Sequence, residues 1–332
     1  MKKSFFLHMT SNLNLQCLFF QVFHNKMMVF CLLFATVFFQ IKCSSVSGIS
    51  KISDKGKELP VGEVIYNESW LEAKNGNMPL VISVPHGGEI SPAEIPNREC
   101  GTKVRDDNTT QLAFEIENAF KKYERQPFLI VAQIARTKID LNRDLTEATC
   151  GNSIMNDTWE RYHKYIEEAL AKAVEEFGYA LYIDLHGQSH PIKRLELGYL
   201  LSKSDLKDHY DGIEPNVTFT EKSSLKNLLK LNNELILREL LIGDNAFGTL
   251  MENAGFPSVP SLNDPFPHPD EPYFNGGYNT RRYTASGYPN VFGLQIEANF
   301  KGVRDTEENR KKFSDAFALS IMNYLDYLQL QK

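Results

Sequence analysis

The sequence lacks the features that would assign it to several large classes of protein. It contains no internal repeat and no low-complexity segment, and its 42 Asp and Glu outnumber its 36 Lys and Arg, which gives a net charge of −6. This balance argues against a nucleic acid or an anionic membrane surface as partner, because both bind basic surfaces. No G-x-S-x-G, Walker A or Rossmann glycine motif occurs, which weakens serine hydrolase, kinase and dehydrogenase interpretations.

Long hydrophobic runs are also scarce, and the longest lies near the N-terminus. Val29 to Phe39 is preceded by Lys26 and followed by Gln40-Ile41-Lys42 and then the small residues Cys43-Ser44-Ser45, which is the order of a secretory signal peptide. The run is short for a membrane span. We expect residues 1–45 to be a signal peptide with an N-terminal extension, and the mature protein to be secreted and free of the membrane. If the segment is retained, it becomes a signal anchor instead.

Cysteine is sparse, with five residues in the chain. Cys17 and Cys31 leave with the predicted signal, and Cys43 lies near its end. Cys100 and Cys150 remain, either as one disulfide in an oxidising compartment or as two unpaired buried thiols. Four glycosylation sequons agree with secretion and predict a glycoprotein. They begin at Asn67, Asn108, Asn156 and Asn216.

The mature chain alternates apolar runs with helical patterns. The continuous apolar runs are typical of strands covered on both faces; they span residues 80–84, 128–134, 179–183, 195–201 and 292–296. Apolar residues at helical spacing predict helices over residues 112–123, 157–177, 223–242 and 313–328. The alternation predicts an α/β fold of three layers, α/β/α, around a largely parallel mixed sheet. We expect residues 46–332 to form a single domain, with residues 257–288 as a lid or binding loop.

The first confident strand ends in the loop that carries His86, two glycines and Glu89. The ends of strands are where open α/β sheets place their ligands. A second histidine, His186, follows the run at residues 179–183 and is also followed by glycine. Asp184 lies two residues before it, so in an extended chain it points to the same side and can orient the imidazole.

These residues predict a metal site. Catalytic zinc takes three nitrogen or oxygen ligands and leaves one position open, so we expect one zinc ion per chain on His86, His186 and a carboxylate. Glu89 is the first candidate for that carboxylate, and Asp106 and Asp107 compete with it. The alternative is that the histidines are hydrogen-bonded loop residues without a metal.

Four further polar residues are candidates for substrate binding and catalysis. Arg143, beside Asn142, can grip a carboxylate through its planar fork, although a salt bridge with Asp140 or Asp144 is an equal alternative. Arg281 and Arg282 are further candidates for anion binding, with surface charge as the alternative. Glu297 ends the last strand and can act as a general base on water, whereas a structural role is the alternative.

Together the motifs resemble those of the N-formylglutamate amidohydrolase family, which is related to zinc carboxypeptidases and aspartoacylases of phosphorylase/hydrolase-like fold. The resemblance covers roughly residues 79–300, in the family's order. Its motifs are Pro85-His86-Gly87-Gly88, Ile139 to Arg143, Asp184 to Gly187, Thr280-Arg281 with Tyr283, and Leu294 to Glu297.

The resemblance implies a zinc site on His86 and His186, with Glu89 or Asp106 as the carboxylate ligand. It also implies that Asn142 and Arg143 hold the substrate and polarise its carbonyl. In the same way it makes Glu297 the general base and places a substrate carboxylate on Arg281. Two departures are that bacterial family members work in the cytoplasm, and that Leu195 to Asn263 matches nothing in the family.

We therefore expect a secreted, metal-dependent amidohydrolase that cleaves an amide bond of an N-acyl (N-formyl-like) amino acid or a small peptide. The expected partner is a small-molecule substrate that bears a carboxylate. A secreted zinc carboxypeptidase is the close alternative. A non-catalytic extracellular binding protein on the same fold is the alternative of a different class.

Overall fold

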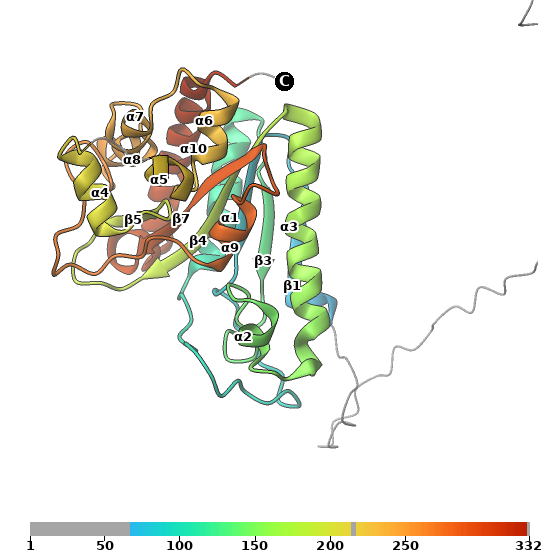
Figure 1. Cartoon of the computed structure of the whole chain (residues 1–332). Coiled ribbons are helices and arrows are strands. Elements are labelled where there is room, and N and C mark those ends of the chain that lie inside the picture. The colour runs from blue at the N-terminus through green and yellow to red at the C-terminus, as the bar shows by residue number, and fades with distance from the viewer. Residues whose placement is uncertain (1–66, 214–216, 331–332) are drawn as a thin grey trace, which may run out of the picture. The chain divides into compact units, whose positions relative to one another are not determined.

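A computed structural model describes residues 67–213 and 217–330 of the chain (Figure 1). The predicted signal segment, residues 46–66 and the sequon at Asn216 lie outside the described residues. The single domain over residues 46–332 therefore stays a prediction. Within the described ranges, no helix is long and apolar enough to cross a membrane.

A mixed sheet of seven strands forms the centre of the described part, in the order β1-β3-β2-β4-β7-β5-β6. The strands are β1 (Leu71–Lys74), β2 (Leu80–Val84), β3 (Phe128–Ala132), β4 (Ala180–Gln188), β5 (Leu195–Gly198), β6 (Ser258–Val259) and β7 (Val291–Asn299). Strands β3, β2, β4 and β7 run parallel, whereas β1 pairs antiparallel with β3 and β5 pairs antiparallel with β7. The predicted largely parallel mixed sheet is confirmed.

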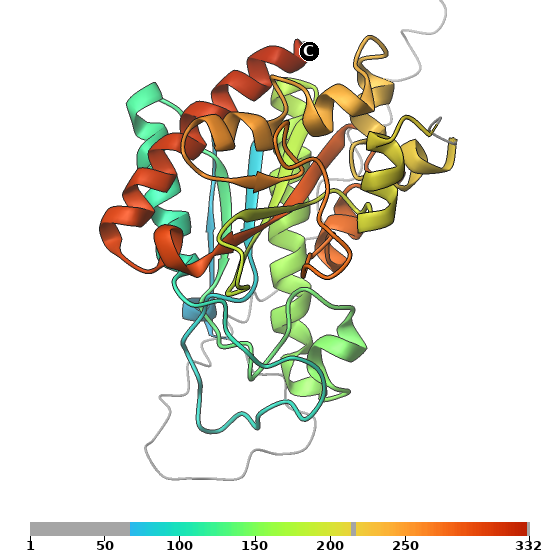
Figure 2. The same cartoon turned by 90° about the vertical axis from the view of Figure 1, so that its left-hand side faces the viewer.

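Helices cover both faces of this sheet, as Figures 1 and 2 show. They are α1 (Thr109–Phe120), α2 (Leu145–Thr149), α3 (Asn156–Phe177), α4 (Lys203–Tyr210), α5 (Val217–Lys222), α6 (Lys226–Leu231), α7 (Leu237–Ile242), α8 (Phe247–Asn253), α9 (Tyr278–Tyr283) and α10 (Glu307–Leu328). Leu80, Ile82 and Val84 pack with α1 and α10 in one apolar cluster. Val81 packs with α3 in the other. Since alternate residues of a strand point to opposite faces, the three predicted layers follow from the sequence of β2.

The predicted helix over residues 223–242 is wrong as a single element. It is two short helices, α6 and α7, separated at Asn232. Asn232 is extended, with φ −135° and ψ 103°, and its side chain accepts a hydrogen bond from the Glu234 backbone at 3.0 Å. Asparagine interrupts the helix because its side chain offers the backbone a local partner. Helix α9 and strand β6 also lie inside the segment predicted as a loop at residues 257–288.

Strands β4 and β7 are longer than predicted, and this places two candidate site residues inside strands. Pairing between the two strands continues from Ala180 opposite Val291 to Gln188 opposite Asn299, so that His186 lies opposite Glu297. The sequence pattern ended these strands at the last apolar residue. The ladder continues because backbone hydrogen bonds between paired strands do not depend on side-chain polarity.

Cys100 and Cys150 form a disulfide, with their Cα atoms 5.8 Å apart. This is the first of the two alternatives that the sequence allowed. The bond ties the loop that leads to Asp106 to the C-terminal end of α2.

Candidate metal centre and active site

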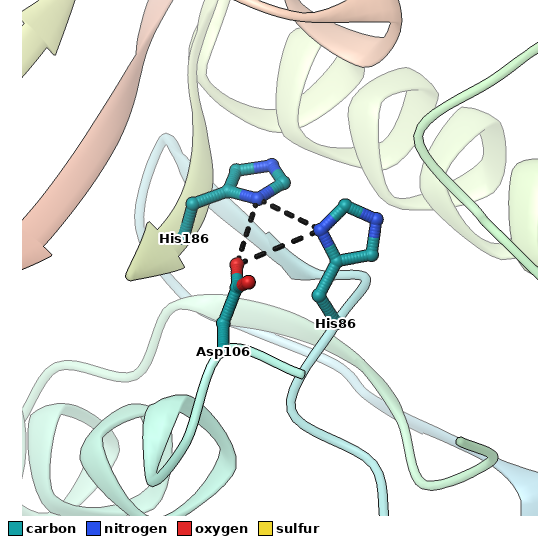
Figure 3. Close-up of side chains that lie close together, drawn as sticks. All are labelled: His86, Asp106 and His186. Carbon is teal, nitrogen blue, oxygen red and sulfur yellow. Dashed lines mark hydrogen bonds and ion pairs between the residues drawn. The ribbon is translucent and has the colours of Figure 1, made fainter. Parts of the chain in front are cut away.

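Three buried side chains from three separate segments converge at the carboxyl ends of β2 and β4 (Figure 3). His86 comes from the loop after β2, Asp106 from the loop before α1, and His186 from β4. The Nδ1 atoms of the two histidines are 3.1 Å apart. Asp106 Oδ2 lies 3.1 Å from His186 Nδ1 and 3.5 Å from His86 Nδ1.

Backbone contacts hold Asp106 between the two histidine segments. Its amide donates to the His86 carbonyl at 3.1 Å, and its carboxylate accepts from the Gly187 amide at 3.2 Å. Gly87 lets the start of α1 approach, because a Cβ there would lie 2.4 Å from Thr110 Oγ1. The glycine after His86 is therefore required by the close packing that brings Asp106 to the site.

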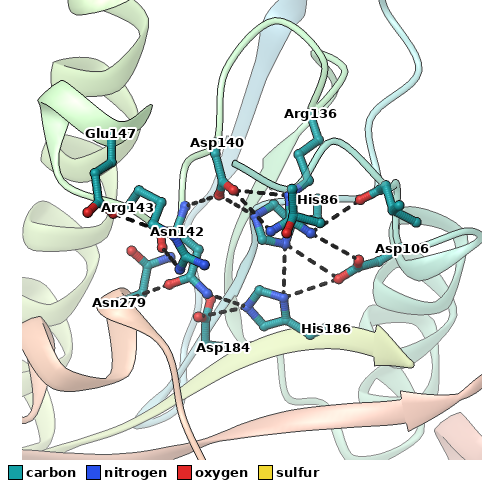
Figure 4. A network of polar contacts seen from close by, with 12 residues as sticks. His86, Asp106, Arg136, Asp140, Asn142, Arg143, Glu147, Asp184, His186 and Asn279 are labelled. Atoms are coloured by element: carbon teal, nitrogen blue, oxygen red, sulfur yellow. Dashed lines mark hydrogen bonds and ion pairs between the residues drawn. The ribbon is translucent and has the colours of Figure 1, made fainter. Parts of the chain in front are cut away.

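The outer nitrogen of each imidazole meets a buried carboxylate (Figure 4). His86 Nε2 lies 2.7 Å from Asp140 Oδ1, and His186 Nε2 lies 2.9 Å from Asp184 Oδ2, with Asn142 Nδ2 further away at 3.2 Å. Burial by itself would raise the pKa of Asp140, but His86 and Arg136 outweigh it and hold that pKa below its usual range. Each carboxylate offers an acceptor for a proton on Nε2, the arrangement in which the Nδ1 lone pairs are free to bind a metal.

The cluster fits a zinc ion by its chemistry and its dimensions. Two Nδ1 atoms and one carboxylate oxygen face a common centre, and a cation between them would satisfy all three. Tetrahedral zinc with ligands at about 2.0–2.1 Å would separate those ligands by about 3.3 Å. The three observed separations of 3.1, 3.1 and 3.5 Å bracket that value.

Of the candidate carboxylates, the structure brings Asp106 to the histidines and leaves Glu89 and Asp107 outside. The side chain of Glu89 is 64% exposed and pairs with Arg105 at 2.6 Å. Asp107 is also exposed and contacts the same arginine at 2.7 Å. β-bridges from Gly88 to Ala135 and from Ile90 to Ile134 fix the backbone on both sides of Glu89, and its side chain lies at the protein surface.

Glu297 lies on β7 directly opposite His186 and is buried. Gln295 Nε2 donates to Glu297 Oε1 at 2.9 Å. Burial raises the pKa of Glu297 to about 8, with Asp106 and Glu196 adding to the rise and His186 opposing it. A carboxyl group with such a pKa can both accept and return a proton near neutral pH.

The candidate substrate-binding residues differ in how many of their side-chain donors already have a partner within the protein. Asn142 is buried, and its Oδ1 accepts from the Asn279 amide at 2.9 Å. Arg143 donates from Nη1 to the Asn142 carbonyl, and its Nε lies 3.7 Å from Glu147 Oε2, which leaves Nη2 free of both contacts. Arg281 is exposed, with one long contact of 3.4 Å to a carbonyl. Arg282 is engaged by Glu167 at 2.7 Å and by a tyrosine hydroxyl. Arg143 and Arg281 therefore keep donors for an anion, whereas Arg282 packs against α3.

Sequence reasoning missed the partner of His86. The sequence suggested Asp140 only as a salt-bridge partner of Arg143. In the structure its carboxylate instead contacts His86 and Arg136, whose Nη2 lies 3.0 Å from Asp140 Oδ2. The available signal was chemical, since a metal-binding histidine needs an acceptor for its second nitrogen. Asp184, by contrast, was predicted to orient His186 and lies beside it.

The predicted glycosylation sites within the described residues differ in access. Asn67 is exposed. Asn108 is half-buried, and its Nδ2, the atom that a glycan would modify, donates to the Arg304 carbonyl at 2.9 Å. Asn156 is half-buried at the first position of α3.

The fold and site define an α/β protein with a His–Asp–His cluster at the carboxyl edge of its parallel strands. No protein-family model matches the chain, and no curated protein matches it. Solved structures do match. An N-formylglutamate amidohydrolase from Ralstonia eutropha JMP134 is similar over 78% of this chain and 98% of its own, at 15% identity and a TM-score of 0.49.

Two further similar structures are an N-acetylmuramyl-L-alanine amidase and a metallo-carboxypeptidase. The amidase, Ami1 from Mycobacterium smegmatis, covers 76% of this chain and 100% of its own at 13% identity, with a TM-score of 0.34. The carboxypeptidase, from Burkholderia cenocepacia, covers 77% and 61% at 10% identity, with a TM-score of 0.35. N-formylglutamate amidohydrolase is thus among the structures that the chain resembles, as the motifs predicted. The chemistry proposed below rests on the side chains of this site.

Proposed function

We propose that this protein is a zinc-dependent hydrolase that cleaves the amide bond of a small N-acyl amino acid or a short peptide. The observation that carries the proposal is the convergence of His86, Asp106 and His186 with inward-facing acceptor atoms. When bound there, zinc would act as a Lewis acid on the scissile carbonyl and on water.

Residues around the proposed metal site orient the two histidine ligands in the absence of a metal. Asp140 and Asp184 hold the two imidazoles in the tautomer whose Nδ1 lone pair faces the centre. Arg136 in turn holds Asp140. The ligands are therefore oriented by buried partners and lose little conformational freedom on binding the ion.

Glu297 is the proton carrier of the proposed reaction. Its Oε1 is occupied by Gln295, which leaves Oε2 to accept a proton from the attacking water. The raised pKa makes that carboxylate a stronger proton acceptor, and the departing amine, which is more basic still, then takes the proton. Its position opposite His186 places it beside the ligand cluster.

Arg143 and Arg281 select the substrate in this proposal. Their free donors would hold a substrate carboxylate and support the negative charge that develops on the carbonyl oxygen. The proposed partner is accordingly a small molecule that bears a carboxylate. A secreted location agrees with the Cys100–Cys150 disulfide.

The first test is zinc content, measured by elemental analysis of protein purified without chelator. We expect about one zinc per chain, a clear loss in His186→Ala, and no loss in His209→Ala, a buried histidine on α4. Zinc-loaded protein is then screened against N-acyl amino acids and short peptides. If the protein acts only on peptides and removes their C-terminal residue, the enzyme is a carboxypeptidase. If the wild type takes up no zinc, the hydrolase proposal fails and a binding protein on this fold replaces it.

A further inference from the structure

A buried arginine that the proposed reaction does not use lies next to the site. Arg304, at the end of the turn between β7 and α10, is 1% exposed. Each of its three guanidinium nitrogens donates to a backbone carbonyl. Nε donates to Ala298 at 2.9 Å and Nη2 to Gln188 at 2.8 Å, and Nη1 donates to Asp107.

These three carbonyls belong to the three segments that carry the site. Ala298 directly follows Glu297, and Asp107 directly follows Asp106. Gln188 lies two residues after His186. One guanidinium therefore joins segments that are far apart in the sequence and fixes each within two residues of a proposed functional group.

Two further contacts show that the surroundings are shaped for this guanidinium. A Cβ on Gly187 would lie 2.2 Å from Arg304 Cζ, so only glycine between His186 and Gln188 leaves room for it. The Arg304 carbonyl also accepts from Asn108 Nδ2 at 2.9 Å, which adds a second tie to the Asp106 loop.

The role of Arg304 is geometric. Each of its guanidinium nitrogens is engaged by a carbonyl. Burial lowers the pKa of Arg304, while the carboxylates of Asp106 and Glu297 oppose that shift. A planar guanidinium presents donors in fixed directions, and a lysine ammonium cannot reproduce that fork.

We propose that Arg304 is a positioning residue that sets Asp106, His186 and Glu297 relative to one another. The inference rests on the proposed function, because it concerns the same zinc site.

The test compares Arg304→Lys with Arg194→Lys. Arg194 is also buried, but its side chain donates to Asp264 and Glu271. Its backbone carbonyl accepts from Gln188 Nε2, and a lysine at this position keeps that contact. The zinc dissociation constant is measured by competition with a chelator. Residues that orient metal ligands change metal affinity by about 10- to 100-fold, so we expect that loss in Arg304→Lys and less than a twofold change in Arg194→Lys.

A second measurement separates positioning from general loosening of the fold. The Gly187 amide donates to Asp106, so in zinc-free Arg304→Lys its hydrogen exchange is expected to rise, while exchange in the centre of α3 stays unchanged. Equal zinc affinity and equal Gly187 exchange in the two lysine variants would overturn the proposal. Absence of zinc from the wild type would instead overturn the proposed function.

If Arg304→Lys does not fold, Gly187→Ala replaces it. This variant keeps every charge and must displace the guanidinium. We expect at least a tenfold loss of zinc affinity, and unchanged affinity would overturn the proposal.

Discussion

Asp140→Asn is the most informative single substitution outside the ligand set. The change keeps the size of the side chain and removes its negative charge. In the wild type Asp140 is 1% exposed and lies 2.7 Å from His86 Nε2. It also accepts from Arg136 at 3.1 and 3.0 Å and from the Asn142 amide at 3.1 Å.

From these contacts we expect Asp140→Asn to lower both the stability of the fold and the affinity for zinc. Leaving one partner of a buried ion pair without its counter-ion costs about 3–5 kcal/mol. We expect the lower end, because Arg136 keeps the Val104 carbonyl at 3.2 Å and Asp106 at 3.7 Å. Replacing the charged acceptor of His86 with a neutral amide should also weaken zinc binding about 10- to 100-fold, which corresponds to about 1.4–2.8 kcal/mol.

Urea unfolding of zinc-free protein measures the first loss, and chelator competition measures the second. Asp144→Asn is the matched control, because Asp144 is an exposed N-cap of α2 in the same loop. An asparagine caps a helix about as well as an aspartate, so this control should change neither quantity appreciably. If Asp140→Asn binds zinc as tightly as the control, Asp140 does not orient a metal ligand and the reasoning is refuted.

Three further predictions use other parts of the molecule. Glu297→Gln should lower kcat by about 10²–10⁴-fold with zinc content unchanged, and full activity in initial-rate assays would exclude Glu297 as the proton carrier. Burial lowers the pKa of His163 to about 3, so the unfolded chain takes up a proton near pH 6.5 that the folded chain refuses. The free energy of unfolding therefore keeps its full value above that pH and falls as the pH drops, by about 2 kcal/mol at pH 5. In urea unfolding, the midpoint should depend less on pH in His163→Gln than in the wild type. An unchanged dependence would contradict the assignment. Replacing Cys100 and Cys150 with serine opens a loop with a sequence separation of 50 and should cost up to about 4 kcal/mol in the chain-entropy model, whereas the same unfolding midpoint with and without the bond would contradict it.

Local patterns predicted most of the fold. The apolar face of α3 and the glycine that ends it were readable because helix period and the left-handed C-terminal turn are properties of a few neighbouring residues. Gly178 has φ 85° and its amide caps the Val174 carbonyl at 2.9 Å. The same reasoning failed at Asn232, where a local hydrogen bond divides a helix without breaking its apolar period.

Sequence reasoning also found both histidines and Glu297, because a polar residue at the end of an apolar strand is conspicuous. It could not choose the carboxylate. Glu89 and Asp106 are equally good ligands on chemical grounds, and the choice depends on how the loop from His86 to α1 turns.

The sequence by itself therefore determined the five inner strands of the sheet, helices such as α3 and the residue types of the site, since these depend on periods and propensities that act over a few residues. Only the tertiary structure decided that Asp106 faces the histidines while Glu89 lies exposed at the surface beside Arg105. It also decided that Asp140 supports His86 and that one buried arginine joins three site segments. These partners are separated by tens to hundreds of residues, and the spacing of side chains along a chain carries no information about contacts that chain folding alone creates.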